Sequence, residues 1–425
     1  MSASSSPDVA PARWSLPTRI AFRFFFSFFL LYLQMPFFVS LPRLNPAVLR
    51  FWDAIVSRVG RAVFGVAVKW EPSGSGDTTW NWVQLFVMVV TSLAITILWS
   101  IVDRRRLAYP RLHAFLRIYV RFALALAMFM YGIVKVIPMQ FSAPPLERLL
   151  QPVGEMSPMG LLWTFMGYSA AYTIFAGLGE MLGGLLLTTR RTALLGALIT
   201  AAVMTNVAIM NFAYDVPVKI YSSILLLAAS FIIAPDAKRL FELFVLNRAV
   251  EPRPLHRFVR QPWLHNTLRV LRTLAVILFV SQTFQRTLYA RRTFRPADER
   301  AALHGIWNVD ELTVDGVARP PLLTDTTRWR RVIFSGNRGV TIQFVNDSRE
   351  RYGVMHDLSG FILKKRDNPL WQASFFSKRP DPRTLLVDGH MDGHKIVATL
   401  HKQPEPKFLL TSRGFHWINE QPFNR

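Results

Sequence analysis

The chain has 425 residues, of which 51% are hydrophobic and 18% charged, and its mean hydropathy is +0.24. This composition excludes an ordinary soluble globular protein and indicates a polytopic membrane protein. The net charge of +23 would suit nucleic acid, but the basic residues before position 290 gather at the ends of apolar segments, as topology-determining charges do. We therefore expect a lipid bilayer, and no nucleic acid, as the partner. The absence of cysteine excludes disulfides, iron–sulfur clusters and thiol chemistry within the chain.

Residues 1–18 are mostly small and polar and are expected to form a disordered cytoplasmic N-terminus. No cleavage site ends the apolar run at 19–41, so we expect this run to be retained as the first span. After Pro46, apolar residues recur at helical spacing with charges between them, which predicts an amphipathic helix at the membrane surface. Asp77 is expected to cap a second span at 80–102. Region 19–114 thus holds two leading spans and an interfacial helix.

The arginines from Arg104 to Arg121 form the strongest cytoplasmic marker in the sequence and set the topology of region 115–235. A third span at 115–137 is expected to run outward into an external loop at 138–151. Ser157 and Pro158 predict a helix start, but the run to residue 188 is too long for one upright span. We therefore expect a short surface helix to about residue 167, then a span that carries Glu180. Spans at 192–212 and 216–233 complete a core of four.

Region 236–290 is predicted to be a basic cytoplasmic segment with a surface helix around 238–246, followed by a seventh span at 268–288. With seven spans and a cytoplasmic N-terminus, residues 301–425 are expected outside the cytoplasm. Here apolar residues alternate with polar ones, as in Ile396, Ala398 and Leu400, and turns are predicted at 335–339, Asp388-Gly389 and Asp392-Gly393. Eight to ten short strands indicate an all-β domain, either an up-and-down barrel or a sandwich. Gly305-Ile-Trp307 resembles the opening Gly-x-Trp of lipocalins.

Ionisable side chains inside the predicted spans are the candidate functional residues, because each costs about 2.5–3.5 kcal/mol at the centre of a membrane helix. Glu180, near the midplane, is the candidate acid/base, and Tyr131 or Lys135 the candidate proton donor. Glu180 is expected to contact Tyr131 or Asn206 more easily than it contacts Lys135. We predict an outward-opening polar ladder that binds the oxygens of a quinone or similar head group. Its predicted ligand-binding residues are Asn206, Asn211, Asp215 and Lys219.

Structural interpretations compete with this one. Lys135 and Glu180 can form a purely structural ion pair, and Lys135 alone can extend to the membrane interface. Asp215 is better placed to cap the sixth span than to catalyse, and Gly179 and Gly183 favour close helix packing over ligand binding. All nine histidines lie outside the spans or at their edges, so a membrane-embedded bis-histidine haem cannot be built from this chain. No metal site is evident.

Region 115–235 resembles the DoxX family. The resemblance rests on Gly132-Ile-Val-Lys135 at the outer end of one span, on Gly179-Glu180-Met-Leu-Gly183-Gly184 in the next, and on the Thr/Arg turn that follows. It implies a four-span core in a bacterial inner membrane and a subunit of a quinone-linked membrane oxidoreductase. A quinone would be the cofactor, and a separate redox partner subunit would hold the redox centre. Whether the chain is an enzyme stays open: the alternative is a non-enzymatic protein that binds a lipid or apolar ligand, or assists assembly of a partner complex.

Overall fold

The computed structural model describes residues 13–34, 45–251, 261–294, 303–335, 339–356, 359–368, 370–404 and 407–424. Its internal contacts divide the chain into two compact units. Unit 1 comprises Met1–Val136 and Phe175–Thr283, and unit 2 comprises Ile137–Ile174 and Phe284–Arg425. The segment that the sequence analysis placed in the middle of the four-span core, residues 137–174, therefore belongs to the same unit as the C-terminal β-domain.

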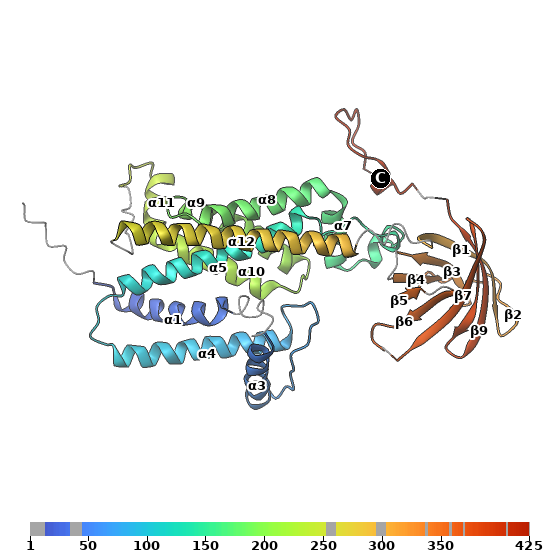
Figure 1. Cartoon of the computed structure of the whole chain (residues 1–425), viewed down its shortest axis with the longest axis horizontal. Helices are drawn as coiled ribbons and strands as arrows, with labels where there is room; N and C mark the ends of the chain where they lie inside the picture. The colour runs from blue at the N-terminus through green and yellow to red at the C-terminus, as the bar shows by residue number, and fades with distance from the viewer. Residues whose placement is uncertain are drawn as a thin grey trace, which may run out of the picture. The chain divides into compact units, whose positions relative to one another are not determined.

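Seven helical runs in the described residues are long and apolar enough to cross a membrane, which confirms the predicted polytopic bundle. The helices concerned are α1 (Leu16–Leu33), α4 (Thr79–Val102), α5 (Pro110–Val136), α8 (Ala170–Leu187), α9 (Ala193–Ala213), α10 (Lys219–Ile233) and α12 (Pro262–Phe294). In Figure 1, α1, α4, α5 and α10 run alongside one another. The run from α10 continues through η2 (Ala234–Asp236) into α11 (Ala237–Phe244), which matches the surface helix predicted around 238–246. The predicted end of the first span, residues 35–41, lies outside the described residues.

The amphipathic segment after Pro46 forms helix α3, Asn45–Phe64. Its apolar side packs on α4: Trp52 and Val56 are buried with Val83 and Met88. Asp53 fixes the contact, because its Oδ1 accepts hydrogen bonds from the Trp80 indole at 3.0 Å and from the Trp70 backbone at 2.8 Å. The helical spacing predicted from the sequence is therefore correct, and its apolar face is covered by the neighbouring helix.

The expected break before the span of Glu180 is present. A short helix α7 (Pro158–Tyr168) begins at Ser157, whose hydroxyl accepts a hydrogen bond from the Gly160 backbone at 3.1 Å. The chain becomes extended at Ser169 and then starts α8. Before α7 lie two single-turn elements, α6 (Leu146–Leu149) and η1 (Val153–Glu155). The length argument from the sequence thus located the break correctly.

The C-terminal region is a closed antiparallel barrel, so the sandwich alternative is wrong. Its sheet runs in the order β2-β1-β3-β4-β5-β6-β7-β8-β9, and β1 also pairs with β9, which closes eight strands into a ring (Figure 1). The strands are β1 (Gly305–Val314), β2 (Val317–Ala318), β3 (Trp329–Phe334), β4 (Gly339–Phe344), β5 (Arg349–His356), β6 (Gly360–Lys364), β7 (Gln372–Asp381), β8 (Thr384–Met391) and β9 (His394–Lys402).

The barrel interior is filled by side chains. Trp307 on β1, Phe334 on β3 and Leu400 on β9 are each at most 1% exposed, and the Trp307 indole donates to the Leu303 carbonyl at 2.8 Å. The predicted inward-facing residues of β9 are confirmed: Ile396, Ala398 and Leu400 belong to this buried cluster. A core packed with aromatic and aliphatic side chains makes the barrel a solid domain.

One outer face of the barrel is covered as well. On β4 the outward-facing Thr341 and Gln343 are buried along with their inward-facing neighbours. Next to them, Arg349 of β5 forms an ion pair with Glu155 at 2.5 Å and donates to the Leu150 carbonyl at 3.3 Å. These bonds attach the segment between α5 and α7 to the strands, because an arginine can bind a carboxylate and a carbonyl at once.

Two of the three predicted turns can be compared with the structure. Asp392-Gly393 joins β8 to β9 with φ values of 51° and 83°, as predicted. Asp388-Gly389 was predicted wrongly, because both residues lie inside β8. A Cβ on Gly389 would lie 2.1 Å from the Ser374 carbonyl oxygen, so glycine is required there by the closeness of β7. The third predicted turn, 335–339, falls mostly on residues outside those described.

Candidate membrane-embedded polar site

Lys135 of α5 and Glu180 of α8 form a direct ion pair in unit 1. The Lys135 ammonium donates a hydrogen bond to Glu180 Oε1 at 2.5 Å. The two residues are only 6% and 3% exposed. The sequence analysis expected Glu180 to reach Tyr131 or Asn206 more easily, so the direct contact is a correction. Charges in a low-dielectric interior are retained when each has its partner, and this pair meets that condition.

Glycines bring the two helices close enough for the pair to form. A Cβ on Gly177 of α8 would lie 2.7 Å from the Gly132 carbonyl oxygen and 2.8 Å from the Lys135 Cβ. A Cβ on Gly132 of α5 would lie 2.5 Å from the Met181 side chain. Small residues at membrane helix contacts permit such approach. The stem of Lys135 therefore starts within reach of α8.

The second carboxylate oxygen of Glu180 is buried and makes no hydrogen bond among the described residues. A buried acceptor without a donor costs about 1–3 kcal/mol, so this oxygen is the least satisfied part of the pair. A donor group from a bound molecule would satisfy it, whereas a proton on Oε2 would remove the charge and create an O–H donor that needs an acceptor. This orphan oxygen distinguishes the site from a fully satisfied structural ion pair.

Tyrosines line the site on the side of α5 and α10. The Lys135 ammonium lies 5.5 Å from the centre of the Tyr131 ring, close enough for a cation–π interaction. The ring centres of Tyr131 and Tyr221 are 5.9 Å apart, and Tyr32 of α1 lies within electrostatic range of both. Tyr221 and Tyr32 were not predicted as site residues. The available signal was a phenol inside a predicted span, the same signal that identified Tyr131.

The remaining residues of the predicted ladder lie elsewhere. Asn206 is on the exposed face of α9 and does not join the pair. Asn211, near the end of α9, is buried, but its side-chain amide donates to the carbonyl of Val218 at 3.5 Å. Val218 lies in the turn that precedes α10. Asp215 is in the same turn and forms an ion pair with Lys219 at 2.8 Å, with its side chain 84% exposed. The structure therefore unites Lys135, Glu180 and Tyr131 and separates the four predicted ligand-binding residues from them.

Asp77, not Asp215, caps the sixth span. The two carboxylate oxygens of Asp77 accept hydrogen bonds from the backbone N–H groups of Lys219 and Ile220 at 2.6 and 3.0 Å. Helix α4, which Asp77 was expected to cap, is capped instead by Thr78, whose hydroxyl accepts a hydrogen bond from the Asn81 backbone at 3.3 Å. A carboxylate at a helix start is favourable wherever it comes from in the sequence. Asp77 thus ties the start of α10 to the start of α4.

The two glycines predicted to allow close packing differ. A Cβ on Gly183 would lie 2.6 Å from the Thr200 hydroxyl of α9, so this glycine does permit a close contact. Gly179 has only the Val203 side chain near it, at 3.9 Å. The closest approach of α5 and α8 is made by Gly132 and Gly177, which the sequence analysis did not identify as packing glycines.

A groove lies on α9 and α10 away from the ion pair. It is open to the surface, has a volume of about 610 Å³, and is lined by none of the predicted site residues. Its lining is mostly apolar and consists of Thr205, Ala208, Ile209, Phe212, Ala213, Ser223 and Leu226. Such a surface suits an acyl or isoprenoid chain better than a polar head group. Among the described residues no cluster of three or more histidine, aspartate or glutamate side chains is arranged to hold a metal ion.

Comparisons with known proteins add one relative. No family model matches the chain, and no solved structure matches it. The uncharacterized protein YwoB of Bacillus subtilis (strain 168) is 33% identical over 126 residues, which is 29% of this chain and 79% of that protein. Because the match covers most of the relative at this identity, the chain belongs to the family of YwoB.

Proposed function

We propose that this integral membrane protein binds the head group of a quinone, or of a similar carbonyl-bearing molecule, at Lys135 and Glu180, as a subunit of a membrane oxidoreductase. The observation that carries the proposal is the orphan Oε2 of Glu180, buried beside a cation and a phenol. Carbonyl and hydroxyl oxygens of such a head group match these donors and acceptors. The resemblance to the DoxX family agrees with it.

In this proposal each side chain has a defined part. Glu180 holds or releases a proton at Oε2 while Oε1 stays bonded to the ammonium of Lys135. Lys135 keeps the carboxylate in place and offsets its charge, and the Tyr131 hydroxyl donates to a ligand oxygen. A quinone, when bound, would supply the electron-accepting chemistry, and the electrons would come from a partner subunit. Asn206, Asn211, Asp215 and Lys219 have no part in the site.

The proposed setting is a bacterial inner membrane with the N-terminus in the cytoplasm and the barrel outside it. The arginines that follow α4, from Arg104 to Arg106, support this orientation, because cytoplasmic loops are enriched in basic residues. Lys135 is then nearer the outer side and Glu180 nearer the midplane. Protons would exchange with the outer side.

The test is to purify the full chain from native membranes in mild detergent and quantify co-extracted quinone by mass spectrometry. We expect the wild-type protein to retain quinone together with its reduced quinol. Glu180→Gln should lose about tenfold of the quinol, since the charge-assisted bond from a quinol hydroxyl to the carboxylate is worth about 1.5–3 kcal/mol. Asp215→Asn, at an exposed carboxylate of the same unit, is the matched control and should retain it. Absence of quinone from the wild-type protein, or equal retention in both variants, would contradict the proposal.

A second candidate is a non-enzymatic protein that binds a lipid or apolar ligand, and the groove on α9 and α10 favours it. Its ligand would not lie in the barrel, whose interior is filled. Ala208→Phe would place a large side chain in this groove and leave Glu180 unchanged. Loss of a co-purified lipid in Ala208→Phe, with no quinone in any sample, would favour this candidate over the first.

A further inference from the structure

A segment after the barrel presents large apolar side chains to solvent. This C-terminal segment, residues 407–424, follows β9 and holds one short helix, α14 (Leu409–Ser412). Phe415, Trp417 and Ile418 are 77%, 91% and 77% exposed. Tryptophan is highly buried on average in folded domains. Three such side chains within four positions therefore indicate a surface that binds a partner.

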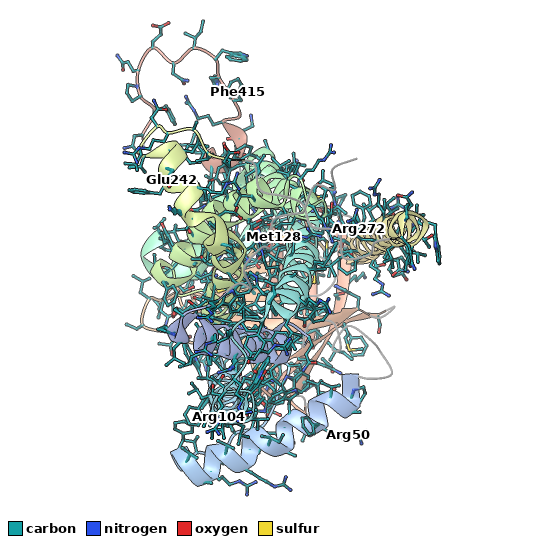
Figure 2. All side chains as sticks on the ribbon, turned by 90° about the vertical axis from the view of Figure 1, so that its left-hand side faces the viewer. Arg50, Arg104, Met128, Glu242, Arg272 and Phe415 are labelled. Carbon is teal, nitrogen blue, oxygen red and sulfur yellow. The ribbon has the colours of Figure 1, made fainter. Side chains whose placement is uncertain are left out.

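Contacts within the C-terminal segment hold its shape. The rings of Phe415 and Trp417 meet edge to face, with their centres 5.0 Å apart. The Arg413 guanidinium lies 3.9 Å from the centre of the Phe423 ring and donates a hydrogen bond to the Asn419 side chain at 2.6 Å. Figure 2 shows Phe415 in the open loop that these residues form. The loop thus has contacts of its own, while its large apolar side chains remain outside the buried cluster of the barrel.

The C-terminal segment leaves the barrel at the end where the chain enters it from α12. At that end Trp307 of β1 pairs with Lys402 of β9, and the Gln403 N–H donates to the Ile306 carbonyl at 2.8 Å. The turn at Asp392-Gly393, between β8 and β9, lies at the opposite end of the barrel. The residues that enter the barrel and those that leave it therefore lie side by side.

The chain lengths on either side of the barrel allow these side chains to reach the bilayer. The span predicted within α12 ends at about residue 288, six helical residues before Phe294, and Leu303 follows nine positions later. This connection is at most ~41 Å long, with ~1.5 Å for each helical residue and ~3.5 Å for each extended one. From Gln403 to Phe415 the chain can extend ~42 Å. The loop is thus long enough to return to the membrane even when the connection is fully extended.

We propose that Phe415, Trp417 and Ile418 insert into the head-group region of the bilayer, in the leaflet on the side of the barrel. Aromatic side chains concentrate at membrane interfaces, where an apolar ring lies beside polar head groups. Residues 407–425 contain three lysine or arginine residues and one glutamate, a balance that favours anionic lipid. A protein partner would have to be recruited, whereas the bilayer is always within reach of this tethered loop. The attachment is independent of the buried ion pair and of any role for quinone.

Because the chain lacks cysteine, Ile418→Cys can carry a single fluorophore in the full-length protein. The variant is reconstituted into vesicles of phosphatidylcholine and phosphatidylglycerol. The matched control is Leu370→Cys, at an apolar residue that is 94% exposed in the loop between β6 and β7, at the opposite end of the barrel. We expect a phospholipid with a spin-labelled head group to quench position 418 about twofold more than position 370, because interfacial side chains lie ~5–10 Å into the head-group boundary. Iodide on both sides of the membrane should quench the two positions in the opposite order.

Phe415→Ser combined with Trp417→Ser should lower lipid quenching at position 418 to the level of position 370. Both replaced side chains are exposed, so the barrel can fold without them. Equal lipid quenching at positions 418 and 370, or no effect of the double substitution, would overturn the proposal. If position 418 becomes shielded from iodide only as the protein density in the vesicles rises, the surface binds a second copy of the chain and not the membrane.

Discussion

Lys135 and Glu180 form the buried ion pair on which the proposed function depends. Each would be costly alone in the membrane, and each makes the other tolerable at a distance of 2.5 Å. The pair is asymmetric, because one oxygen of Glu180 is bonded and the other is not. A pair whose only task was to fix the helices would gain from satisfying both oxygens. The unsatisfied one is therefore the atom to test.

Removing the charge of Lys135 alone should destabilise the protein more than removing the charges of both Lys135 and Glu180. Lys135→Met leaves the carboxylate of Glu180 buried without its cation, which costs about 3–5 kcal/mol for a buried pair. Lys135→Met combined with Glu180→Leu removes both charges and should recover most of that loss. Thermal unfolding of the detergent-solubilised protein measures both. If the double variant is as unstable as the single one, the side chains contribute mainly by packing and not by charge.

The barrel has residues whose charge affects stability at acid pH. Asp315 accepts hydrogen bonds from the His394 ring at 2.7 Å and from the Lys395 backbone at 2.8 Å, and these bonds lower the pKa of its carboxyl below the usual value. A lowered pKa in the folded state stabilises the protein above the unfolded-state pKa of about 3.9. This contribution is lost as the pH falls through the lower, folded-state value.

We therefore expect the wild-type barrel to be more stable than Asp315→Asn near neutral pH, and the difference to shrink below about pH 4. Asp315 has a positive φ of 52°. Asparagine also tolerates a positive φ, so the substitution need not change the backbone. Tryptophan fluorescence of the full chain during heating gives the measurement. Asp367→Asn, at an exposed loop residue, is the control. A difference that is constant with pH would show that the Asp315 charge does not matter.

At the scale of elements, the contact of α5 with α8 depends on two glycines that lie opposite each other. The Cβ of any other residue at position 177 would meet backbone atoms of α5, which cannot move aside as a flexible side chain can. The same contact places Lys135 within reach of Glu180. Helix packing and the candidate site are thus one feature of the fold.

Gly177→Ala should lower stability by about 1–3 kcal/mol, because the added methyl overfills the α5–α8 contact. Gly179→Ala adds the same methyl two residues away, where the nearest atom is 3.9 Å distant, and should be neutral or mildly stabilising, since alanine favours helix. Thermal unfolding of the two variants side by side is the measurement. Equal behaviour would mean that α5 and α8 are not closely packed in the membrane.

At the scale of the whole molecule, the segment 137–174 belongs with the barrel although the spans on either side of it belong to unit 1. The ion pair of Arg349 with Glu155 and the burial of Thr341 and Gln343 are part of this attachment. Because the segment and the barrel share one compact unit, we predict that the part of the segment before α8 and the barrel lie on the same side of the membrane. This agrees with the topology proposed from the arginine distribution, which assigns both to the outside.

The absence of cysteine allows a direct test of that topology. A membrane-impermeant maleimide added to spheroplasts should label Ser412→Cys, an exposed position after the barrel. It should label Arg105→Cys, in the exposed turn after α4, only once the membrane is permeabilised. The reverse pattern would invert the orientation. If both positions are labelled from the same side, the number of spans between the turn after α4 and the barrel cannot be odd.

The sequence by itself determined the spans, the break before α8, the alternation along β9 and the turn at Asp392-Gly393. Each depends on composition or periodicity over a few to some twenty neighbouring residues, and such signals are local. It also identified Glu180, Lys135 and Tyr131, because an ionisable or phenolic side chain inside an apolar run is visible without a structure.

Only the tertiary structure decided which of these residues meet. A membrane helix that is apolar on all sides carries little information on which face turns inward, so Asn206 was predicted inside and lies outside. Asp77 caps a helix that starts 142 residues later, and Lys135 meets Glu180 from a different helix. Such contacts are set by the packing of distant elements, whose relative rotation depends on the whole bundle and not on any local pattern.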